Sequence, residues 1–226
     1  MAETPVQNAG KVLTELESKT LLKQYGIPVV DTRLARTARE AVAISKETGF
    51  PVVLKIISPD VVHKSDAGGV KLGLDNATQV RKAYSDIMSS VRRGYPGAHI
   101  DGVSVQAMAP PGIEVIVGMS RDPQFGPVIM FGLGGVLVEV LKDVSFRIVP
   151  VTKFDASEML REIKGYPLLT GYRGTSPAST EALEELIVKV SQFVESQPAV
   201  RELDLNPVFA YSDRAVAVDA RIVMDA

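Results

Sequence analysis

Arg201-Glu-Leu-Asp-Leu-Asn-Pro-Val-Phe209 is a segment in which polar and apolar residues alternate, the pattern of a β-strand with one wet and one buried face. Asp204 and Asn206 are two positions apart, so both side chains should lie on the wet face. After a turn, Ala215-Val-Ala-Val-Asp-Ala220 runs back as a second short strand. We therefore expect a C-terminal hairpin that brings Asp219 beside Asn206.

Two oxygen-bearing side chains on neighbouring strands, Asn206 and Asp219, would form a sparse site for a hard cation. Mg²⁺ suits such a site, because it usually keeps several waters and takes further ligands from nucleotide phosphates. The alternative is that Asp204, Asn206 and Asp219 are solvated side chains on an edge hairpin. The hairpin by itself does not separate the two.

The composition of the 226-residue chain argues against several classes of protein. Its 46% hydrophobic and 23% charged residues are ordinary for a globular domain, and a net charge of -2 gives no basic surface for nucleic acid. No apolar run approaches the roughly 18 residues of a membrane span, and the N-terminus does not read as a signal peptide. The absence of cysteine excludes disulfides and thiolate metal sites and fits a cytoplasmic location.

Hydrophobic periodicity, capping residues and glycine stops divide the chain into helical and extended segments. Helices are expected at 14–25, 37–49, 76–94, 156–164 and 180–196, and strands at 27–30, 50–57, 70–74, 103–108, 113–118 and 127–131 besides the C-terminal pair. The strands at 103–108 and 113–118 are expected to form a hairpin around Pro110-Pro-Gly112. Strands joined by short turns, with helices grouped between them, indicate an α+β fold with a subdomain boundary near 94–102.

Lys55 is the one charge within the apolar strand at 50–57, where a lysine is costly unless it has a partner. The alternative is that its ammonium group reaches the surface. The loop that follows, His63-Lys-Ser-Asp-Ala-Gly-Gly-Val70, carries Gly68 and Gly69, whose backbone N–H groups can approach an anion. Its spacing is not that of a P-loop. Lys55 and this loop together indicate a phosphate site.

His63 stands at the start of the glycine loop, where we expect the phosphate. A neutral imidazole can act as a nucleophile toward a phosphoryl group and carry it covalently. The alternative is a loop histidine that bonds a carbonyl group. The sequence leaves both open.

Other polar positions also remain open between binding and structural roles. Glu114, in an apolar strand, can accept ribose hydroxyls, support the lysine or the histidine, or face water. The segment Gln106-Ala107-Met108 can offer backbone hydrogen bonds and an apolar surface to adenine, or it can be a core strand. Arg147 and Arg173 lie near glycine-rich segments and can bind a phosphate, lie at a subunit interface or face solvent.

Three stretches that occur in the same order point to one family: Ser58-Pro-Asp-Val-Val-His-Lys-Ser-Asp-Ala-Gly-Gly-Val70, Phe131-Gly-Leu-Gly-Gly-Val136 with Glu139-Val-Leu-Lys-Asp-Val-Ser-Phe-Arg147, and Glu202-Leu-Asp-Leu-Asn-Pro207. With them the chain resembles the ATP-grasp family. The resemblance is closest to the β subunit of ADP-forming acetate–CoA and acyl-CoA synthetases, relatives of succinyl-CoA synthetase, and it extends from Leu13 to Ile222.

The resemblance implies the ATP-grasp fold, in which two α+β subdomains enclose a nucleotide. It divides the chain into an N-terminal lead-in and helix (1–25), a small lid subdomain (26–102) and a large subdomain with the metal site (103–226). The positions that match nucleotide-binding residues of the family are Lys55, Gly68, Gly69, Gln106, Ala107, Met108 and Glu114. Of these, Lys55 and the two glycines match phosphate contacts, and residues 106–108 match the adenine hinge.

The remaining functional positions concern the metal and phosphoryl transfer. The resemblance implies that Asn206 and Asp219 are the Mg²⁺ ligands, the pair that the hairpin pattern also selects. His63 matches a histidine that relays the phosphoryl group. Asp204 matches an acidic residue that orients a phosphohistidine nearby.

The implied reaction is the reversible conversion acyl-CoA + ADP + phosphate ⇌ carboxylate + CoA + ATP, with ATP or ADP and Mg²⁺ as cofactors. The chain has no Rossmann-type glycine fingerprint for CoA and no second domain for an acyl site. We therefore expect an α subunit that carries the CoA-binding and acyl sites and a phosphohistidine, in a hetero-oligomer such as α2β2. The alternatives are a free-standing ATP-grasp carboxylate–amine ligase and a nucleotide-binding regulatory subunit without chemistry.

Overall fold

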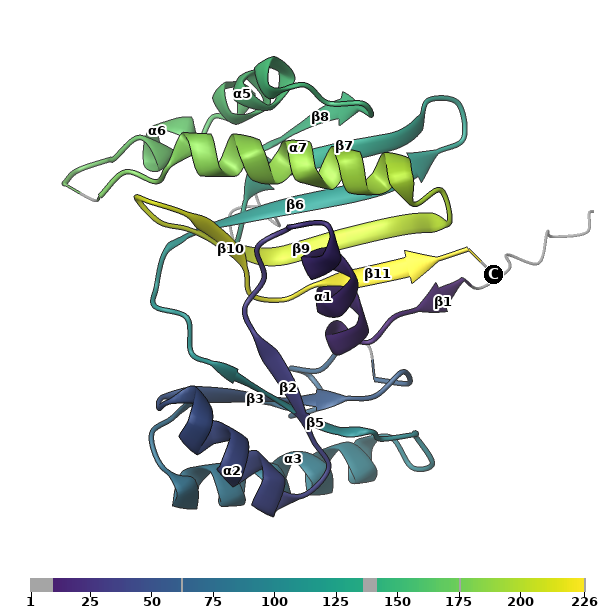
Figure 1. Cartoon of the computed structure of the whole chain (residues 1–226), viewed down its shortest axis with the longest axis vertical. Helices are drawn as coiled ribbons and strands as arrows, with labels where there is room; N and C mark the ends of the chain where they lie inside the picture. Colours follow the sequence, from purple (N-terminus) through teal and green to yellow (C-terminus); the bar gives the residue numbers. More distant parts are fainter. Residues whose placement is uncertain (1–9, 62, 136–141, 175, 226) are drawn as a thin grey trace, which may run out of the picture. The chain divides into compact units, whose positions relative to one another are not determined.

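The computed structural model describes residues 10–61, 63–135, 142–174 and 176–225 (Figure 1). Most of the N-terminal lead-in and Glu139 lie outside these residues. The elements in chain order are β1 (Lys11–Val12), α1 (Glu15–Gln24), β2 (Thr32–Ala35), α2 (Ala38–Thr48), β3 (Val52–Ile57), β4 (Val70–Leu74), α3 (Ala77–Gly94), β5 (Gly102–Ala107), β6 (Ile113–Asp122), β7 (Gly126–Leu133), β8 (Val144–Ile148), α5 (Lys153–Glu162), α6 (Tyr166–Leu169), α7 (Thr180–Ser196), β9 (Val200–Ala210), β10 (Ala215–Ala217) and β11 (Arg221–Met224). None of the described helices is long and apolar enough to cross a lipid bilayer.

The chain divides into two compact units. Unit 1 comprises Met1–Leu13, Leu21–Pro28 and Gly112–Ala226, and unit 2 comprises Thr14–Thr20 and Val29–Pro111. Each unit combines an antiparallel sheet with helices, so the predicted α+β class is confirmed. The main division lies between Pro111 and Gly112 rather than at the expected 94–102, because β5 belongs to the sheet of unit 2.

Unit 2 is built on a four-stranded sheet in the order β2-β5-β3-β4, with helices α2 and α3 packed against each other and on the sheet (Figure 1). Its core takes Val52, Leu54 and Ile56 from β3, and Val103 and Val105 from β5. Because side chains alternate between the faces of a strand, the residues between them lie on the opposite face of the sheet. That second face positions the candidate site.

Two sequence expectations about strands are wrong. The strands near 103–108 and 113–118 do not pair: β5 pairs with β2 and β3, whereas β6 pairs with β7 and β9. Both segments are apolar, and an apolar segment predicts a strand but not the strand with which it pairs. The strand expected at 27–30 is reduced to a single bridge at Val29, and β2 begins later, because the Ile27 amide donates to the Leu22 carbonyl at the end of α1.

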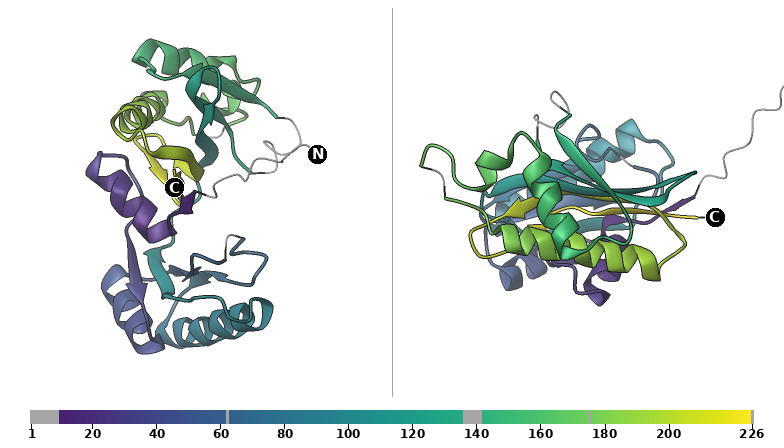
Figure 2. Two further views of the ribbon diagram at one scale, coloured as in Figure 1. Left: turned by 90° about the vertical axis from the view of Figure 1, so that its right-hand side faces the viewer. Right: turned by 90° about the horizontal axis from the view of Figure 1, so that it is seen from above.

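Unit 1 is built on a seven-stranded antiparallel sheet in the order β1-β11-β9-β6-β7-β8, with β10 also pairing with β9. Helices α5 and α7 pack against each other and against this sheet (Figure 2). Helix α7 has the predicted bounds, and its apolar face is buried: Leu183, Leu186, Ile187, Val190, Phe193 and Val194.

A methyl group at Gly69 should destabilise unit 2, because a Cβ there would lie 2.6 Å from Ile56 Cγ2 and 2.9 Å from the Lys64 carbonyl oxygen. We expect Gly69→Ala to lower the free energy of unfolding by about 1–3 kcal/mol, measured by urea unfolding. Gly94→Ala is the matched control, since its Cβ would meet nothing within 4 Å. Equal stability of the two variants would contradict the packing described here.

Candidate functional site

Lys55 lies on the second face of the small sheet and is buried, with 5% of its surface exposed. Its Nζ donates to Glu15 Oε1 at 2.8 Å. The surface-reaching alternative for this lysine is therefore wrong, and the partner that a buried lysine requires is Glu15. Across the ladder, Lys55 faces Ser104 of β5, whose hydroxyl donates to the Lys55 carbonyl.

Glu15 belongs to the first turn of α1. Thr14 and Glu17 form a capping box that starts the helix, with Glu17 N–H donating to Thr14 Oγ1 and Thr14 N–H donating to Glu17 Oε2. The buried positions that follow, Glu15, Ser18, Lys19 and Leu22, have the i, i+3, i+4, i+7 spacing of a core-facing stripe.

The sequence interpretation missed both Glu15 and Lys19. A signal for them was present in the sequence. Both are polar residues at core-facing positions of the helix, where apolar residues are normally found. Because charged residues are almost never fully buried unless paired, a Glu and a Lys at such positions indicate a buried ion pair.

The Glu15 carboxylate accepts hydrogen bonds from three lysines. Its Oε1 accepts from Lys19 and Lys55, both at 2.8 Å, and its Oε2 accepts from Lys64 at 2.6 Å. Burial opposes ionisation of Glu15, but the charges of Lys55, Lys19 and Lys64 outweigh it and hold the pKa of the carboxyl well below its usual range. The carboxylate is therefore ionised throughout the neutral range.

Lys19 connects this cluster to Gln106, a residue of the predicted adenine hinge. Lys19 Nζ donates to Gln106 Oε1 at 2.8 Å and to Thr32 Oγ1 at 3.0 Å. The Gln106 side chain is buried, and within the described ranges its Nε2 has no hydrogen-bond partner. An orphaned buried donor of this kind fits a ligand or a water that supplies an acceptor.

The other two hinge positions lie on the surface. Ala107 and Met108 are both exposed, Met108 at 40% of its surface. The Met108 N–H donates to the Pro51 carbonyl at 3.0 Å. Met108 therefore offers a base its thioether and carbonyl rather than its amide.

The segment from His63 to Gly69 is a tight turn closed by its own backbone. The amides of Ala67, Gly68 and Gly69 donate to the carbonyls of His63, Ser65 and Lys64. The two glycine amides thus bond within the loop rather than standing open to an anion. Gly68 has φ 66°, a left-handed conformation that favours glycine.

His63 itself is exposed, and among the described residues its imidazole has no hydrogen-bond partner. Within the described ranges, the structure records no carbonyl bonded to this imidazole. An exposed imidazole is accessible to an incoming phosphoryl group.

Asn206 lies on β9, and Asp219 lies in the short segment between β10 and β11. Ala217 pairs with Val208 and Arg221 pairs with Asp204, so the segment that contains Asp219 runs alongside the part of β9 that contains Asn206. Asn206 is exposed and Asp219 half-buried. The part of the chain that the structure describes holds no group of three or more acidic, histidine or cysteine residues arranged for a metal. A pair of oxygen ligands fits a Mg²⁺ ion that keeps waters and takes its other ligands from phosphate.

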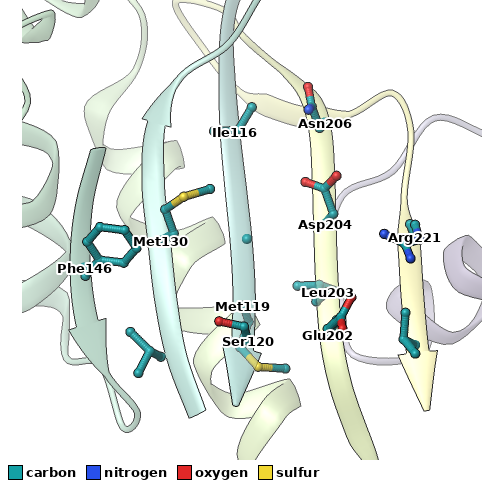
Figure 3. Close-up of a pocket in the computed structure, with 13 residues that line it drawn as sticks. Ile116, Met119, Ser120, Met130, Phe146, Glu202, Leu203, Asp204, Asn206 and Arg221 are labelled. Atoms are coloured by element: carbon teal, nitrogen blue, oxygen red, sulfur yellow. The ribbon is translucent and has the colours of Figure 1, made fainter. Parts of the chain in front are cut away.

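Asp204 lines a pocket of about 430 Å³ on the large sheet (Figure 3). Asp204 and Asn206 follow one another along β9, and Arg221 of β11 lies beside Asp204. Met130 and Phe146 give the other side of the pocket an apolar surface, Phe146 being 54% exposed. Burial raises the pKa of the Asp204 carboxyl, Arg221 opposes that rise and Asp219 adds to it. Asp204 belongs to unit 1 and His63 to unit 2.

Glu114, the remaining predicted nucleotide residue, is exposed at the start of β6. Its backbone carbonyl accepts from the Gly134 amide at 2.7 Å. A Cβ on Gly135 would lie 3.1 Å from Glu114 Oε2, so the glycine segment passes close to this carboxylate. The role of Glu114 in the nucleotide pocket stays a prediction.

The two arginines left open by the sequence have local partners. Arg147 of β8 forms a bidentate ion pair with Glu162 of α5. Arg173 lies on a turn with φ 49°, and its guanidinium lies 5.3 Å from the centre of the Tyr172 ring. Neither geometry indicates a phosphate site.

Comparison with known proteins identifies the family. A family model described as an ATP-grasp domain matches residues 5–224, so the chain belongs to the ATP-grasp family. The chain is 55% identical over 212 residues to acetate–CoA ligase (ADP-forming) I subunit beta of Pyrococcus furiosus, covering 94% of this chain and 91% of that protein. It is 49% identical over 222 residues to acetate–CoA ligase (ADP-forming) I of Archaeoglobus fulgidus, covering 98% of this chain and 32% of that longer protein.

Solved structures agree with this placement. Acetyl-coenzyme A synthetase 1 of Candidatus Korarchaeum cryptofilum, in complex with coenzyme A and Ca-AMPCP, matches with a TM-score of 0.93 and 51% identity, covering 95% of this chain and 93% of that one. Another structure of that synthetase holds coenzyme A and Mg-AMPPCP, with a phosphohistidine segment pointing towards the nucleotide binding site; it matches with a TM-score of 0.84 and 48% identity, covering 95% and 93%. The family and fold expected from the sequence are confirmed.

Glu15→Gln should destabilise the protein at neutral pH, because it leaves buried lysines without their shared carboxylate. We expect a loss of about 3–5 kcal/mol in the free energy of unfolding at pH 7. Since the folded-state pKa of Glu15 is lowered, its stabilisation is present above the ordinary value of 4.5 and is lost as the pH falls toward the folded-state value. The difference between wild type and variant should therefore shrink in acid, as measured by urea unfolding across pH.

The control for this experiment is Glu47→Gln, which removes a charge of the same unit from an exposed pair with Arg33. It should change stability by less than about 1 kcal/mol. Equal effects of the two substitutions at pH 7, or a Glu15→Gln deficit that does not change with pH, would contradict the assigned ion cluster.

Proposed function

We propose that this chain is the nucleotide-binding β subunit of an ADP-forming acyl-CoA synthetase that works with an α subunit in the cytoplasm. The observation that carries the proposal is the match to a relative named as such a subunit, over 94% of this chain and 91% of the relative. The longer Archaeoglobus fulgidus relative supports the partner, because one polypeptide there joins a region like this chain to a larger remainder.

The nucleotide would be held by the residues that the sequence resemblance selects. Lys55 would be the buried cation that contacts the phosphates. The turn that contains Gly68 and Gly69, which leads into β4, would lie beside them. The unpartnered Nε2 of Gln106 supports a ligand near the predicted hinge, since it lacks an acceptor in the described structure. Glu114 would accept ribose hydroxyls.

Asn206 and Asp219 would hold Mg²⁺ together with phosphate oxygens and water. The bound ion would offset the negative charge of the transferring phosphoryl group, a main source of catalysis in phosphoryl transfer. Asn206 is exposed, which suits a ligand that must reach an ion carried in with the nucleotide.

His63 would relay the phosphoryl group. An acyl phosphate forms on the α subunit from acyl-CoA and phosphate with release of CoA, and a histidine of that subunit takes the phosphoryl group and releases the carboxylate. The His63 imidazole then attacks phosphorus as the bond to the α-subunit imidazole breaks. A terminal oxygen of ADP next displaces His63 and forms ATP. Asp204 would orient the phosphohistidine during these steps, and α2β2 is the assembly that we propose.

The two alternatives receive less support. A free-standing carboxylate–amine ligase would give His63 no covalent role, and the relatives compared above are named as acetate–CoA ligases. A regulatory subunit without chemistry would not need Lys55, His63, Asn206 and Asp219 together.

The test replaces His63 by Asn and follows radiolabelled phosphate in the presence of acetyl-CoA, ADP, Mg²⁺ and a candidate α subunit. Wild type should carry acid-labile label and transfer it to ADP. In His63→Asn both signals should fall by about 1,000-fold or more, because the covalent step is removed. His99→Asn removes the other, exposed histidine and should behave as wild type. ATP formation by His63→Asn at the wild-type rate would overturn the relay.

A further inference from the structure

We propose that Glu15 is a positioning residue of the phosphate site, which holds the ammonium groups of Lys55 and Lys64 as a pair that binds the diphosphate of ADP. This inference rests on the proposed function, because it takes Lys55 as the lysine that contacts the nucleotide phosphates. It assigns Lys64 as a second phosphate-binding residue.

The geometry of the carboxylate carries the inference. Glu15 Oε1 accepts from Lys55 of β3 at 2.8 Å, and Glu15 Oε2 accepts from Lys64 of the following loop at 2.6 Å. Since the two oxygens belong to one carboxylate, both ammonium groups lie within hydrogen-bond distance of the same acid. An ammonium group has three N–H donors, so a lysine bonded to Glu15 can also donate to a phosphate oxygen.

The carboxylate is itself held in place. Lys19, one turn further along α1, bonds Glu15 Oε1 and is tied to the sheet through Thr32 and Gln106. Glu15 is 3% exposed and Lys19 2%, so burial leaves their side chains little freedom. When packing and hydrogen bonds already hold the groups that bind a ligand, less conformational entropy is lost on binding.

Lys64 extends this support to the loop. Its side chain is 20% exposed, against 6% for Lys55, so Lys64 is the more accessible of the two cations. It directly follows His63, and its carbonyl accepts from the Gly69 amide at 2.7 Å. The ion pair with Glu15 therefore holds the residue next to His63, and the Lys64 carbonyl closes the turn onto Gly69.

A test that separates positioning from a purely structural role compares ADP with AMP. Titration calorimetry in Mg²⁺ would measure both affinities for wild type, Glu15→Gln, Lys64→Met and the exposed control Glu47→Gln. In Glu15→Gln and Lys64→Met we expect ADP to bind about 10-fold more weakly, as for the loss of one hydrogen bond to a charged group. AMP affinity should change less than about 2-fold, and Glu47→Gln should match wild type.

Lys64→Met keeps Glu15 paired with Lys19 and Lys55, so it tests the proposal even where Glu15→Gln does not fold. Equal weakening of ADP and AMP would assign Glu15 a structural role and overturn the inference. Unchanged ADP affinity in Lys64→Met would overturn it as well, with the proposed function intact. Absence of ADP binding to wild type would instead refute the proposed function and this inference with it.

Discussion

The ion cluster around Glu15 is the interaction on which the candidate site depends. A lysine in the middle of a buried strand has to be neutralised, and Glu15 supplies the carboxylate for Lys55 from a helix 40 residues earlier in the chain. The same carboxylate bonds Lys19 and Lys64. One buried acid thereby links α1, β3 and the His63 loop.

The two sheets use strand alternation in the same way. In unit 2, alternation places Val52, Leu54 and Ile56 in the helix-covered core and turns Lys55 to the second face. In unit 1, the same rule buries Leu203 and Leu205 of β9 and sends Asp204 and Asn206 to the pocket face. In each unit, therefore, the same strand contributes apolar side chains to the core on one face and polar side chains on the other face.

The sequence predicted those features that depend on local pattern. Helix α7, the alternation along β9 and the antiparallel return of the chain after Arg214 follow from periodicity and short turns. The partners of β5 and the acceptor for Lys55 could not be predicted in this way, because strand pairing and a helix-to-strand ion pair are set by tertiary packing. Glu15 and Lys19 are charged residues at core-facing positions of α1. That placement was the available signal for a buried ion pair, but no role was inferred from it.

The most direct test of the account is a crystal structure of the chain with ADP and Mg²⁺. Lys55 Nζ should lie within hydrogen-bond distance, about 2.7–3.2 Å, of a phosphate oxygen while Glu15 still accepts from it. A structure in which the phosphates bind elsewhere and Lys55 contacts only Glu15 would contradict it. In that case the buried cluster would serve the stability of unit 2 and not the binding of a nucleotide.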